Sequence, residues 1–288
     1  MRLIVVIIIV FINNITFAQN NTDVSLFFKK DSTNYLNEVS SKEGDLFNVL
    51  GHHGSAIENE WLGFRIYFNK VAAIDVYSKT KEGLEIRKAQ WYPSVEQQKN
   101  GWGADYYKVG NTVGLGGIRL WDGEKVVPLN PITKRTARVV KEGTISYMEM
   151  LSEGIPYKNT NVDILVRVTV FTGIRKAKVE AFALTSEPVQ FVTGINHHPG
   201  HKINSESNYI STWGLHPEDV AVDKIEIGSA ILFNPNDFVQ KISEESQYLL
   251  VSKPTKLLES WIVSANAKEK KLNTFEKFLA YIEEESKL

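Results

Sequence analysis

The stretch that decides the fold is VDILVRVTVF, residues 162–171. Polar and apolar side chains alternate around a spine of β-branched residues, a pattern typical of a strand with one buried face. Residues 64–68 (FRIYF) and 178–185 (KVEAFALT) have a similar pattern. The repetition of such segments along the chain predicts an all-β fold.

Further candidate strands are separated by Gly, Pro, Asn or Asp turn signals such as Asp122-Gly123. They are residues 72–78, 84–91, 117–121, 145–151, 189–196, 220–227, 229–233, 248–252 and 257–264. So many short strands predict a large antiparallel β-sandwich or barrel. No repeat, low-complexity tract or linker interrupts the chain, so we expect one domain over residues 19–288.

The C-terminus differs from the rest of the chain and predicts an α-helix. Asn273 can cap a helix whose third residue is Glu276. One stripe of this helix would be apolar, because it carries Phe275, Phe278, Leu279 and Ile282. We expect the helix to pack on the sandwich through that stripe.

The N-terminus has the pattern of an export signal. Residues 1–18, MRLIVVIIIVFINNITFA, contain Arg2, an apolar run from Leu3 to Ile12, and a small residue at Ala18. This apolar run is too short to span a bilayer as a helix, which takes about 20 residues. We therefore expect cleavage after Ala18 and a periplasmic or secreted protein without a membrane anchor.

Composition excludes several classes of protein. The 288 residues are 43% hydrophobic and 23% charged, an ordinary globular composition. The absence of cysteine excludes disulfides, lipid-modified cysteine, cysteine nucleophiles and thiolate zinc sites. The 33 Lys and Arg and the 34 Asp and Glu are evenly mixed, without the clustered basic surface that a nucleic-acid partner requires.

All six histidines lie at or near Gly or Pro turn signals, and three of them fall in NHHPGHK, residues 196–202. His198-Pro199-Gly200-His201 fits a type II turn, which would bring the Cα atoms of His198 and His201 within about 7 Å. Two imidazoles would then converge at the end of the strand 189–196. The alternative is that these turn histidines are merely exposed.

The second histidine pair opens GHHGSAIENEWLGFRIYF, residues 51–68. We expect residues 57–68 to form one strand, in which a bulge at Gly63 would exchange the faces of the two halves. Without the bulge, one face carries Asn59, Trp61, Arg65 and Tyr67, and the other carries Glu58, Glu60, Leu62, Phe64 and Ile66. Adjacent side chains diverge in extended backbone, so only one of His52 and His53 should point into a given cleft.

Residues 92–123 are rich in glycine but lack the spacing of a phosphate-binding loop. Their aromatic residues alternate with charged ones: Trp102, Tyr106, Tyr107 and Trp121 with Asp105, Lys108 and Arg119. Aromatic rings beside polar groups suit the mixed surface of a sugar. We expect residues 105–107 to form a surface binding segment and Trp121 to lie in the core.

These segments together carry a family resemblance. The blocks GHHGSAIENEWLGFRIYF, AIDVYSK, GWGADYYKVG, GLGGIRLWDGEKVVPL and GINHHPGH resemble the bacterial family called domain of unknown function 4861. The resemblance implies an exported protein of polysaccharide-degrading bacteria that dehydrates uronic-acid oligosaccharides, such as those from ulvan, a sulfated algal polysaccharide. The chain also resembles the galactose-mutarotase-like supersandwich of sugar epimerases and polysaccharide lyases.

Dehydration of a uronic acid needs three kinds of group. A cation must neutralise the carboxylate, a base must remove the C5 proton, and an acid must protonate the departing C4 hydroxyl. We assign the base to His53 or His198 and the acid to Tyr106 or Tyr107, in exchangeable roles. Substrate binding is assigned to Arg65 and Arg119, whose guanidinium groups match a carboxylate, and to His52, His197, Trp102, Asp105 and Lys108.

Other functions remain open at this point. A polysaccharide lyase shares the first step and expels a glycosidic oxygen instead of water. A metal-dependent sugar enzyme could bind a divalent ion through His198 and His201. An epimerase-like or non-catalytic carbohydrate-binding module could use the same side chains. The hypothesis that we rank first is a dehydratase that requires no cofactor and takes a uronic-acid-containing oligosaccharide.

Overall fold

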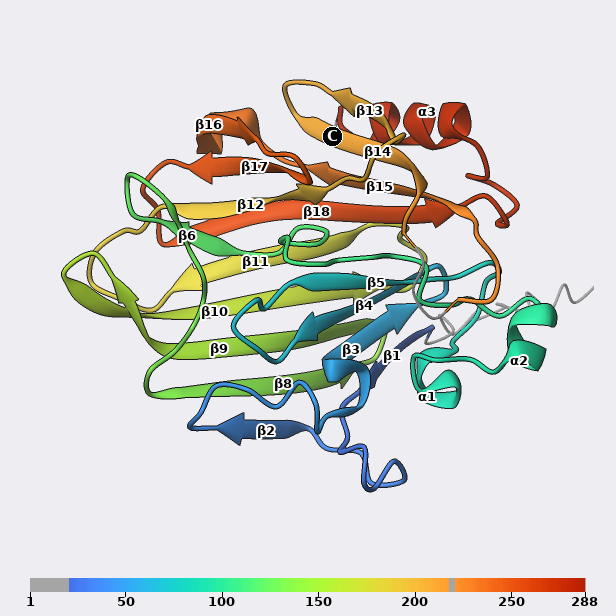
Figure 1. The fold of residues 1–288 in the computed structure, drawn as a ribbon, viewed down its shortest axis with the longest axis horizontal. Coiled ribbons are helices and arrows are strands. Elements are labelled where there is room, and N and C mark those ends of the chain that lie inside the picture. Colours follow the sequence, from blue (N-terminus) through green and yellow to red (C-terminus); the bar gives the residue numbers. More distant parts are fainter. Residues whose placement is uncertain (1–20, 218–220, 288) are drawn as a thin grey trace, which may run out of the picture.

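The computed structural model describes residues 21–217 and 221–287 (Figure 1). The expected signal, residues 1–18, lies outside the described residues, as does the first residue of the expected strand 220–227. No helix in the described part of the chain is long and apolar enough to cross a membrane.

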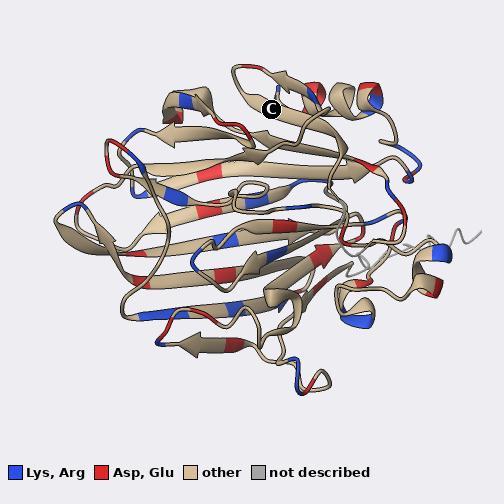
Figure 2. Cartoon of the chain, in the orientation of Figure 1, with Lys and Arg blue, Asp and Glu red and all other residues tan. Residues whose placement is uncertain are grey.

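The larger layer of the fold is a nine-stranded sheet whose paired strands are antiparallel. Its strands, in spatial order, are β13 (Lys202–Ser205), β14 (Tyr209–Leu215), β15 (Glu226–Leu232), β18 (Leu257–Asn266), β11 (Ala177–Ala183), β10 (Thr160–Phe171), β9 (Ile145–Tyr157), β8 (Lys134–Glu142) and β2 (Glu38–Ser41). Lys, Arg, Asp and Glu residues are interspersed along it (Figure 2).

Two smaller antiparallel sheets form the second layer (Figure 1). One comprises β1 (Thr22–Ser25), β3 (Gly54–Asn59), β4 (Leu62–Tyr67) and β5 (Ile74–Ser78). The other comprises β16 (Phe238–Ser243), β17 (Gln247–Ser252), β12 (Phe191–Asn196), β6 (Arg119–Trp121) and β7 (Val126–Val127). A continuous cluster of buried apolar side chains joins the layers, with members such as Phe64 of β4, Val168 of β10 and Phe191 of β12. The predicted all-β antiparallel sandwich is confirmed.

The segment 162–171 forms a strand, as predicted, and makes up all of β10 except its first two residues. Val162, Ile164, Val166 and Val168 are buried, whereas the residues between them are partly exposed. The strand pairs with β9 on one side and with β11 on the other. The alternation of buried and partly exposed side chains therefore matches a strand inside a sheet whose one face lies in the core.

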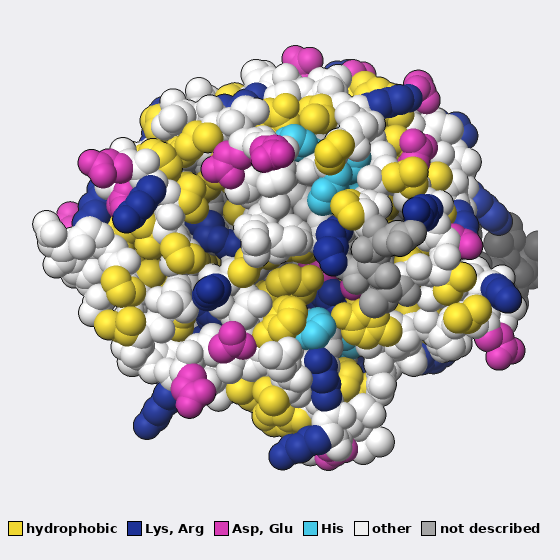
Figure 3. All heavy atoms as spheres, in the orientation of Figure 1, with side chains coloured by type: hydrophobic (Ala, Val, Ile, Leu, Met, Phe, Trp, Pro, Cys, Tyr) yellow, Lys and Arg dark blue, Asp and Glu magenta, His cyan; other side chains and the backbone are white. Residues whose placement is uncertain are grey.

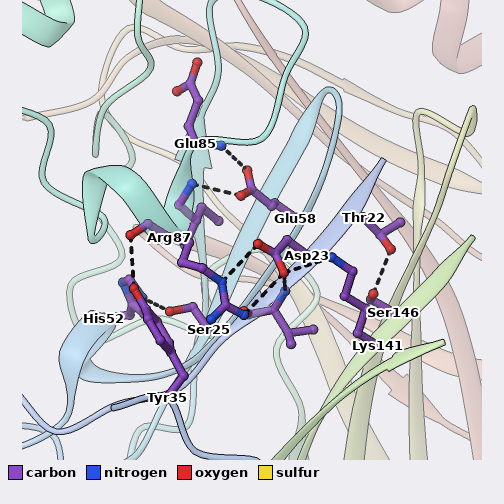
Figure 4. Close-up of polar contacts among 12 residues, drawn as sticks. Thr22, Asp23, Ser25, Tyr35, His52, Glu58, Glu85, Arg87, Lys141 and Ser146 are labelled. Atoms are coloured by element: carbon purple, nitrogen blue, oxygen red, sulfur yellow. Dashed lines mark hydrogen bonds and ion pairs between the residues drawn. The ribbon is translucent and has the colours of Figure 1, made fainter. Parts of the chain in front are cut away.

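The prediction of a strand over residues 84–91 is wrong, because Ile86–Ala89 is a short helix, α1. The Glu58 carboxylate accepts the backbone N–H groups of Glu85 and Ile86 at 2.9 Å each (Figure 4). These bonds satisfy donors that the first turn of a helix leaves unpaired. A second helix, α2 (Val95–Lys99), follows, and its capping residue is Ser94.

The prediction of one strand over residues 57–68 is also wrong, because the segment is the hairpin of β3 and β4. The side chain of Asn59 accepts the N–H groups of Trp61 at 3.0 Å and Leu62 at 2.9 Å, which reverses the chain. Glu58 lies opposite Gly63 in this hairpin. Opposed residues share a face, so Glu58 lies on the same face as Arg65 and not on the other one.

Two smaller predictions also change. The segments 220–227 and 229–233 contribute to one strand, β15, rather than two. The C-terminal helix α3 (Phe275–Glu285) is present, but its cap is Thr274, whose hydroxyl accepts the Lys277 N–H at 3.3 Å. The Asn273 side chain accepts from the Lys277 ammonium instead, at 2.9 Å. Phe278 and Ile282 bury the apolar stripe of the helix, as predicted.

Candidate functional site

His52 and His53 diverge as predicted, although their backbone is not extended. Both have left-handed conformations, with φ of 56° and 57°, in the short 3-10 turn Gly51–His53. His52 is buried and its Nε2 lies 2.7 Å from the Ser25 hydroxyl (Figure 4). His53 is half-buried, and its ring stacks on Phe47 with centroids 3.9 Å apart. This places His52 in the core and leaves His53 at the surface.

The surroundings of His53 define its tautomer. Its Nδ1 lies 2.7 Å from the Phe47 carbonyl oxygen, which can only accept, so Nδ1 carries the proton. In the neutral ring Nε2 is then the proton acceptor, as a general base requires. The Lys29 ammonium lies 3.5 Å from Nδ1, and because both groups are donors in this tautomer they make no hydrogen bond with each other. Lys29 also lines a cavity of about 290 Å³ together with Phe28, Lys30, Asn48 and Val49.

Arg65 of β4 is the centre of a buried ionic cluster. Its Nε donates to Asp75 at 2.7 Å, and one terminal nitrogen contacts Asp105 at 2.9 Å. Burial opposes its charge, but the two carboxylates hold the pKa of Arg65 well above its usual value. Since two protein carboxylates already neutralise this guanidinium, Arg65 is poorly suited to binding a substrate carboxylate, the role that the sequence suggested for it.

Two tyrosines that the sequence analysis did not assign to the site extend the Arg65 cluster towards His53. The Tyr67 hydroxyl donates to Asp75 at 2.9 Å, whereas the Tyr92 hydroxyl accepts from Arg65 at 3.0 Å. Tyr92 is 41% exposed, and its hydroxyl hydrogen remains available to donate. Burial raises the pKa of Tyr92, which keeps it protonated. The His53 ring lies 6.3 Å from Tyr67 and 6.4 Å from Tyr92, measured between centroids.

The prediction that residues 105–107 form a surface segment is wrong, because Asp105, Tyr106 and Tyr107 are all buried. Asp105 is held by Arg65, and Ala104 exchanges backbone hydrogen bonds with Ser78. Burial raises the pKa of Tyr106 to about 12 and that of Tyr107 well above its usual value. The Tyr107 hydroxyl has no hydrogen-bond partner among the described residues. Tyr106 and Tyr107 are therefore buried residues beneath the site, and they do not offer a hydroxyl to a substrate at the surface.

The other substrate-binding candidates have varied positions. Trp102 is partly buried against the apolar cluster around Trp91. His197 packs against Tyr248, with ring centroids 5.0 Å apart and the rings tilted by 37°. Arg119 is buried and donates to the Ile118 carbonyl at 2.7 Å, and burial together with the charge of Arg135 lowers its pKa to about 9. Trp121 is only partly buried, so it is not the fully internal residue that the sequence suggested.

Lys108 connects the Arg65 cluster to a group of three histidines, His198, His201 and His216, termed here the histidine cluster. The Lys108 carbonyl accepts from His198 Nε2 at 3.0 Å, and its N–H donates to His216 Nδ1 at 3.1 Å. The three rings have centroids 4.6–5.4 Å apart. The contacts of residues 105–108 thus link the segment around Arg65 with the segments around His198 and His216.

The predicted turn at 198–201 is present, with a φ of 87° at Gly200 and a His201 N–H to His198 carbonyl hydrogen bond of 3.1 Å. The turn brings His201 next to His198. The third histidine, His216, directly follows the last residue of β14. The sequence contained His216 beside Pro217, but it gave no signal for this partnership. Figure 3 shows histidines gathered in two groups on one face, with Lys and Arg side chains between them.

The tautomers in the histidine cluster bear on the metal-dependent alternative. His216 Nδ1 accepts the Lys108 N–H, so in the neutral ring Nε2 carries the proton and cannot ligate a metal. Within residues 21–217 and 221–287, no group of three His, Asp or Glu side chains is arranged to hold a metal ion. The residues of the cluster therefore do not fit a three-histidine metal site.

The histidine cluster predicts how stability depends on pH. Burial lowers the pKa of all three histidines, that of His201 to about 4, so the folded protein keeps them neutral. The unfolded chain binds protons first, at the usual histidine pKa of about 6.5. Acid therefore favours unfolding, and the free energy of unfolding should fall as the pH drops from about 6.5 towards about 4.

Urea unfolding at a series of pH values measures this effect. His201→Gln should flatten the pH dependence in that window relative to the unchanged protein, because it removes one of the depressed groups. An identical slope in the two proteins would contradict the account. Carboxylates titrate in both proteins, so the difference between the two slopes reports the contribution of His201 alone.

Comparisons with known proteins give one family match. A family model described as a domain of unknown function (DUF4861) matches residues 13–288. No curated protein matches the chain.

Several solved structures are similar at low identity. A protein described as an aldose 1-epimerase from Klebsiella pneumoniae is 9% identical, with a TM-score of 0.40 over 92% of this chain and 95% of that one. A heparan sulfate lyase from Pedobacter heparinus is 8% identical, with a TM-score of 0.35 over 74% of this chain and 34% of the lyase. A 4-alpha-glucanotransferase from Thermococcus litoralis is 12% identical, with a TM-score of 0.36 over 74% of this chain and 39% of that one. The chain thus spans only about a third of the length of the lyase.

Proposed function

The chain belongs to the family described as a domain of unknown function (DUF4861), and from this premise we propose that it is a carbohydrate-active dehydratase. Its substrate would be a terminal uronic acid residue on an oligosaccharide, and its product a 4,5-unsaturated uronate. The observation that carries the proposal is the hydrogen bond from His53 Nδ1 to the Phe47 carbonyl, because it makes Nε2 the basic nitrogen of a ring that lies beside Lys29, a residue that lines a surface cavity.

The base of the proposed reaction is His53. Its Nε2 would accept the C5 proton, and the ring would become a cation that keeps its bond to Phe47. Stacking on Phe47 fixes the orientation of the ring. His198 is the second candidate, but its Nε2 is directed to the Lys108 carbonyl and burial lowers its pKa. The lowered pKa makes His198 a weaker base than an ordinary histidine.

The acid of the proposed reaction is Tyr92 rather than Tyr106 or Tyr107. Its hydroxyl accepts from Arg65, so its own hydrogen can pass to the departing C4 oxygen. Arg65 would stabilise the tyrosinate that remains, because a guanidinium at 3.0 Å favours the negative form. Tyr106 and Tyr107 are buried, and burial holds their protons tightly.

The carboxylate of the substrate would be neutralised by Lys29. This lysine is exposed, borders the cavity of about 290 Å³ and lies next to His53. A cation at the carboxylate favours removal of the adjacent C5 proton, because negative charge moves into the carboxylate as the C–H bond breaks. The base takes one proton and the acid returns one, so the net loss is one water molecule.

Ultraviolet absorbance tests the proposal. Incubation with an oligosaccharide that ends in a uronic acid should produce the absorbance of a 4,5-unsaturated uronate, because the new double bond is conjugated with the carboxylate. A neutral oligosaccharide of the same length should give none, since it lacks the group that acidifies the C5 proton. Unchanged absorbance with a panel of uronic oligosaccharides would contradict the proposal.

A further inference from the structure

A second cavity, of about 360 Å³, lies away from His53 at the opposite end of β4. Tyr67, beside His53, ends β4, whereas Trp61 precedes its first residue and lines the cavity. Five strand steps separate Leu62 from Tyr67, about 17 Å. A volume of this size lies within the usual range for small-ligand sites, about 300–1,000 Å³.

The walls of this cavity are supplied by four separate parts of the chain. They are Trp61, residues 79–82 after β5, Arg175 between β10 and β11, and residues 269–271 after β18. The Asn266 amide donates to the Ser78 hydroxyl at 2.9 Å and to the Lys79 carbonyl at 2.8 Å, which fixes two of these segments to each other. The cavity is therefore held by the fold rather than formed by one loop.

Two ion pairs stiffen the walls. Lys79 is buried and is bonded to Glu58 and to the carbonyls of Asn59 and Gly83. Arg175 donates to both oxygens of Glu269 at 2.7 Å. Because each of these cations has its own carboxylate, neither pair contributes a net charge to the cavity.

The remaining charges give the cavity a positive surplus. Apart from the two ion pairs, the lining contains three lysines, Lys81, Lys270 and Lys271, and one carboxylate, that of Glu82. These residues carry three positive charges and one negative charge. All four of these residues are exposed. An anionic ligand would lower the repulsion between the lysines, whereas a cation would raise it.

The lining also contains an apolar surface and unused donors. Trp61 is partly buried, and the Arg175 guanidinium lies 5.4 Å from the centre of its ring. Trp61 Nε1 and Arg175 Nε are buried N–H groups without a hydrogen-bond partner in the part of the chain that the structure describes. Buried N–H groups in proteins are normally bonded to an acceptor, which a ligand in the cavity could provide. An aromatic wall beside N–H donors suits a sugar ring with oxygen substituents.

We propose that this cavity is a second binding site, for an acidic sugar residue that carries a sulfate or a carboxylate. The choice of a sugar rests on the proposed function, whereas the choice of an anion rests on the lysines. The site would hold a distal part of the substrate or another acidic saccharide, and it takes no part in the elimination at His53.

Titration calorimetry with the full chain tests this site without turnover. Glucose 6-sulfate has no uronic acid and cannot undergo the proposed elimination, so it serves as the sulfated probe, glucuronate as the carboxylated one and glucose as the neutral one. We expect both acidic probes to bind and glucose to bind at least about tenfold more weakly, a loss equivalent to about 1.4 kcal/mol. Added salt should weaken acidic binding.

Charge reversal locates the binding. The double variant Lys270→Glu, Lys271→Glu should weaken binding of glucose 6-sulfate at least about tenfold, again equivalent to about 1.4 kcal/mol; glucuronate does not serve here, because it can also occupy the site at His53. The matched control is Lys42→Glu, Lys70→Glu, which changes the charge equally at exposed lysines outside the cavity lining and should leave binding unchanged.

Three results would overturn the site. They are equal binding of glucose, equal losses in the two double variants, and inorganic sulfate that binds as tightly as glucose 6-sulfate, which would show an anion site without sugar recognition. Intact binding here without any unsaturated product would count against the proposed function alone. Product formation without binding of the acidic probes would count against this site alone.

Discussion

Replacing His53 with alanine is expected to lower turnover of a uronic oligosaccharide about 10²–10⁴-fold, the usual effect of removing a general base. The imidazole accepts the C5 proton in the proposed reaction, and its orientation depends on the Phe47 carbonyl and ring. Because His53 is only half-buried, the fold should survive the change. Single-turnover absorbance assays measure the rate, and circular dichroism checks the fold.

The matched control is His197→Ala, since His197 packs against Tyr248 and is not part of the proposed proton path. It should retain most of the activity. Full activity in His53→Ala would contradict the assignment of the base. A loss confined to His198→Ala would place the base in the histidine cluster instead.

Replacing Arg65 with methionine is expected to lower the free energy of unfolding by about 3–5 kcal/mol, the usual cost of breaking a buried ion pair by removing one partner. The change leaves Asp75 and Asp105 buried without their shared cation. Tyr92 would also lose the donor that orients its hydroxyl, so activity should fall together with stability. Urea unfolding measures the loss of stability.

An ion pair with an exposed cation provides the control for this prediction. Arg138 lies 3.5 Å from Glu149, and its side chain is 47% exposed. Arg138→Met should therefore cost only about 0–1 kcal/mol. Adding Asp105→Asn to Arg65→Met should recover part of the lost stability, because it removes one of the two buried charges that Arg65 neutralised. Equal losses for Arg65→Met and Arg138→Met would contradict the role given to the buried cluster.

Local patterns predicted the strands and turns whose causes lie within a few residues. The alternation in residues 162–171 identified β10, and the Pro-Gly pair identified the turn between His198 and His201. The periodic apolar residues of α3 identified its buried stripe. In each case the residues that determine the structure are close together in the sequence, so the pattern is complete within one segment.

The errors arose where a distant residue decides the local structure. Glu58 caps α1 from 27 and 28 positions away, so the segment 84–91 alone resembled a strand. Arg65 holds Asp105 across 40 positions, which buries a segment whose glycines suggested an exposed loop. Lys108 brings His216 to His198 through bonds that span 108 and 90 positions.

The candidate site was predicted in its residue types and only partly in its members. His53 and His198 were chosen from turn signals, and the structure places His53 against Phe47 and His198 in the histidine cluster. Tyr92 was missed because it follows a turn of left-handed residues, Gln90 and Trp91, that no local motif announces. Lys29 was missed because no histidine lies near it in the sequence, and only the fold brings it to His53.

Mass spectrometry of the product tests the central claim most directly. The cavity that Lys29 lines is small, about 290 Å³, which favours a terminal residue over the interior of a polymer. The account predicts an oligosaccharide that keeps all its sugar units and loses about 18 Da, the mass of the water expelled when His53 and Tyr92 act as base and acid. Two shorter fragments with no mass lost would contradict it and would make the protein a chain-cleaving lyase.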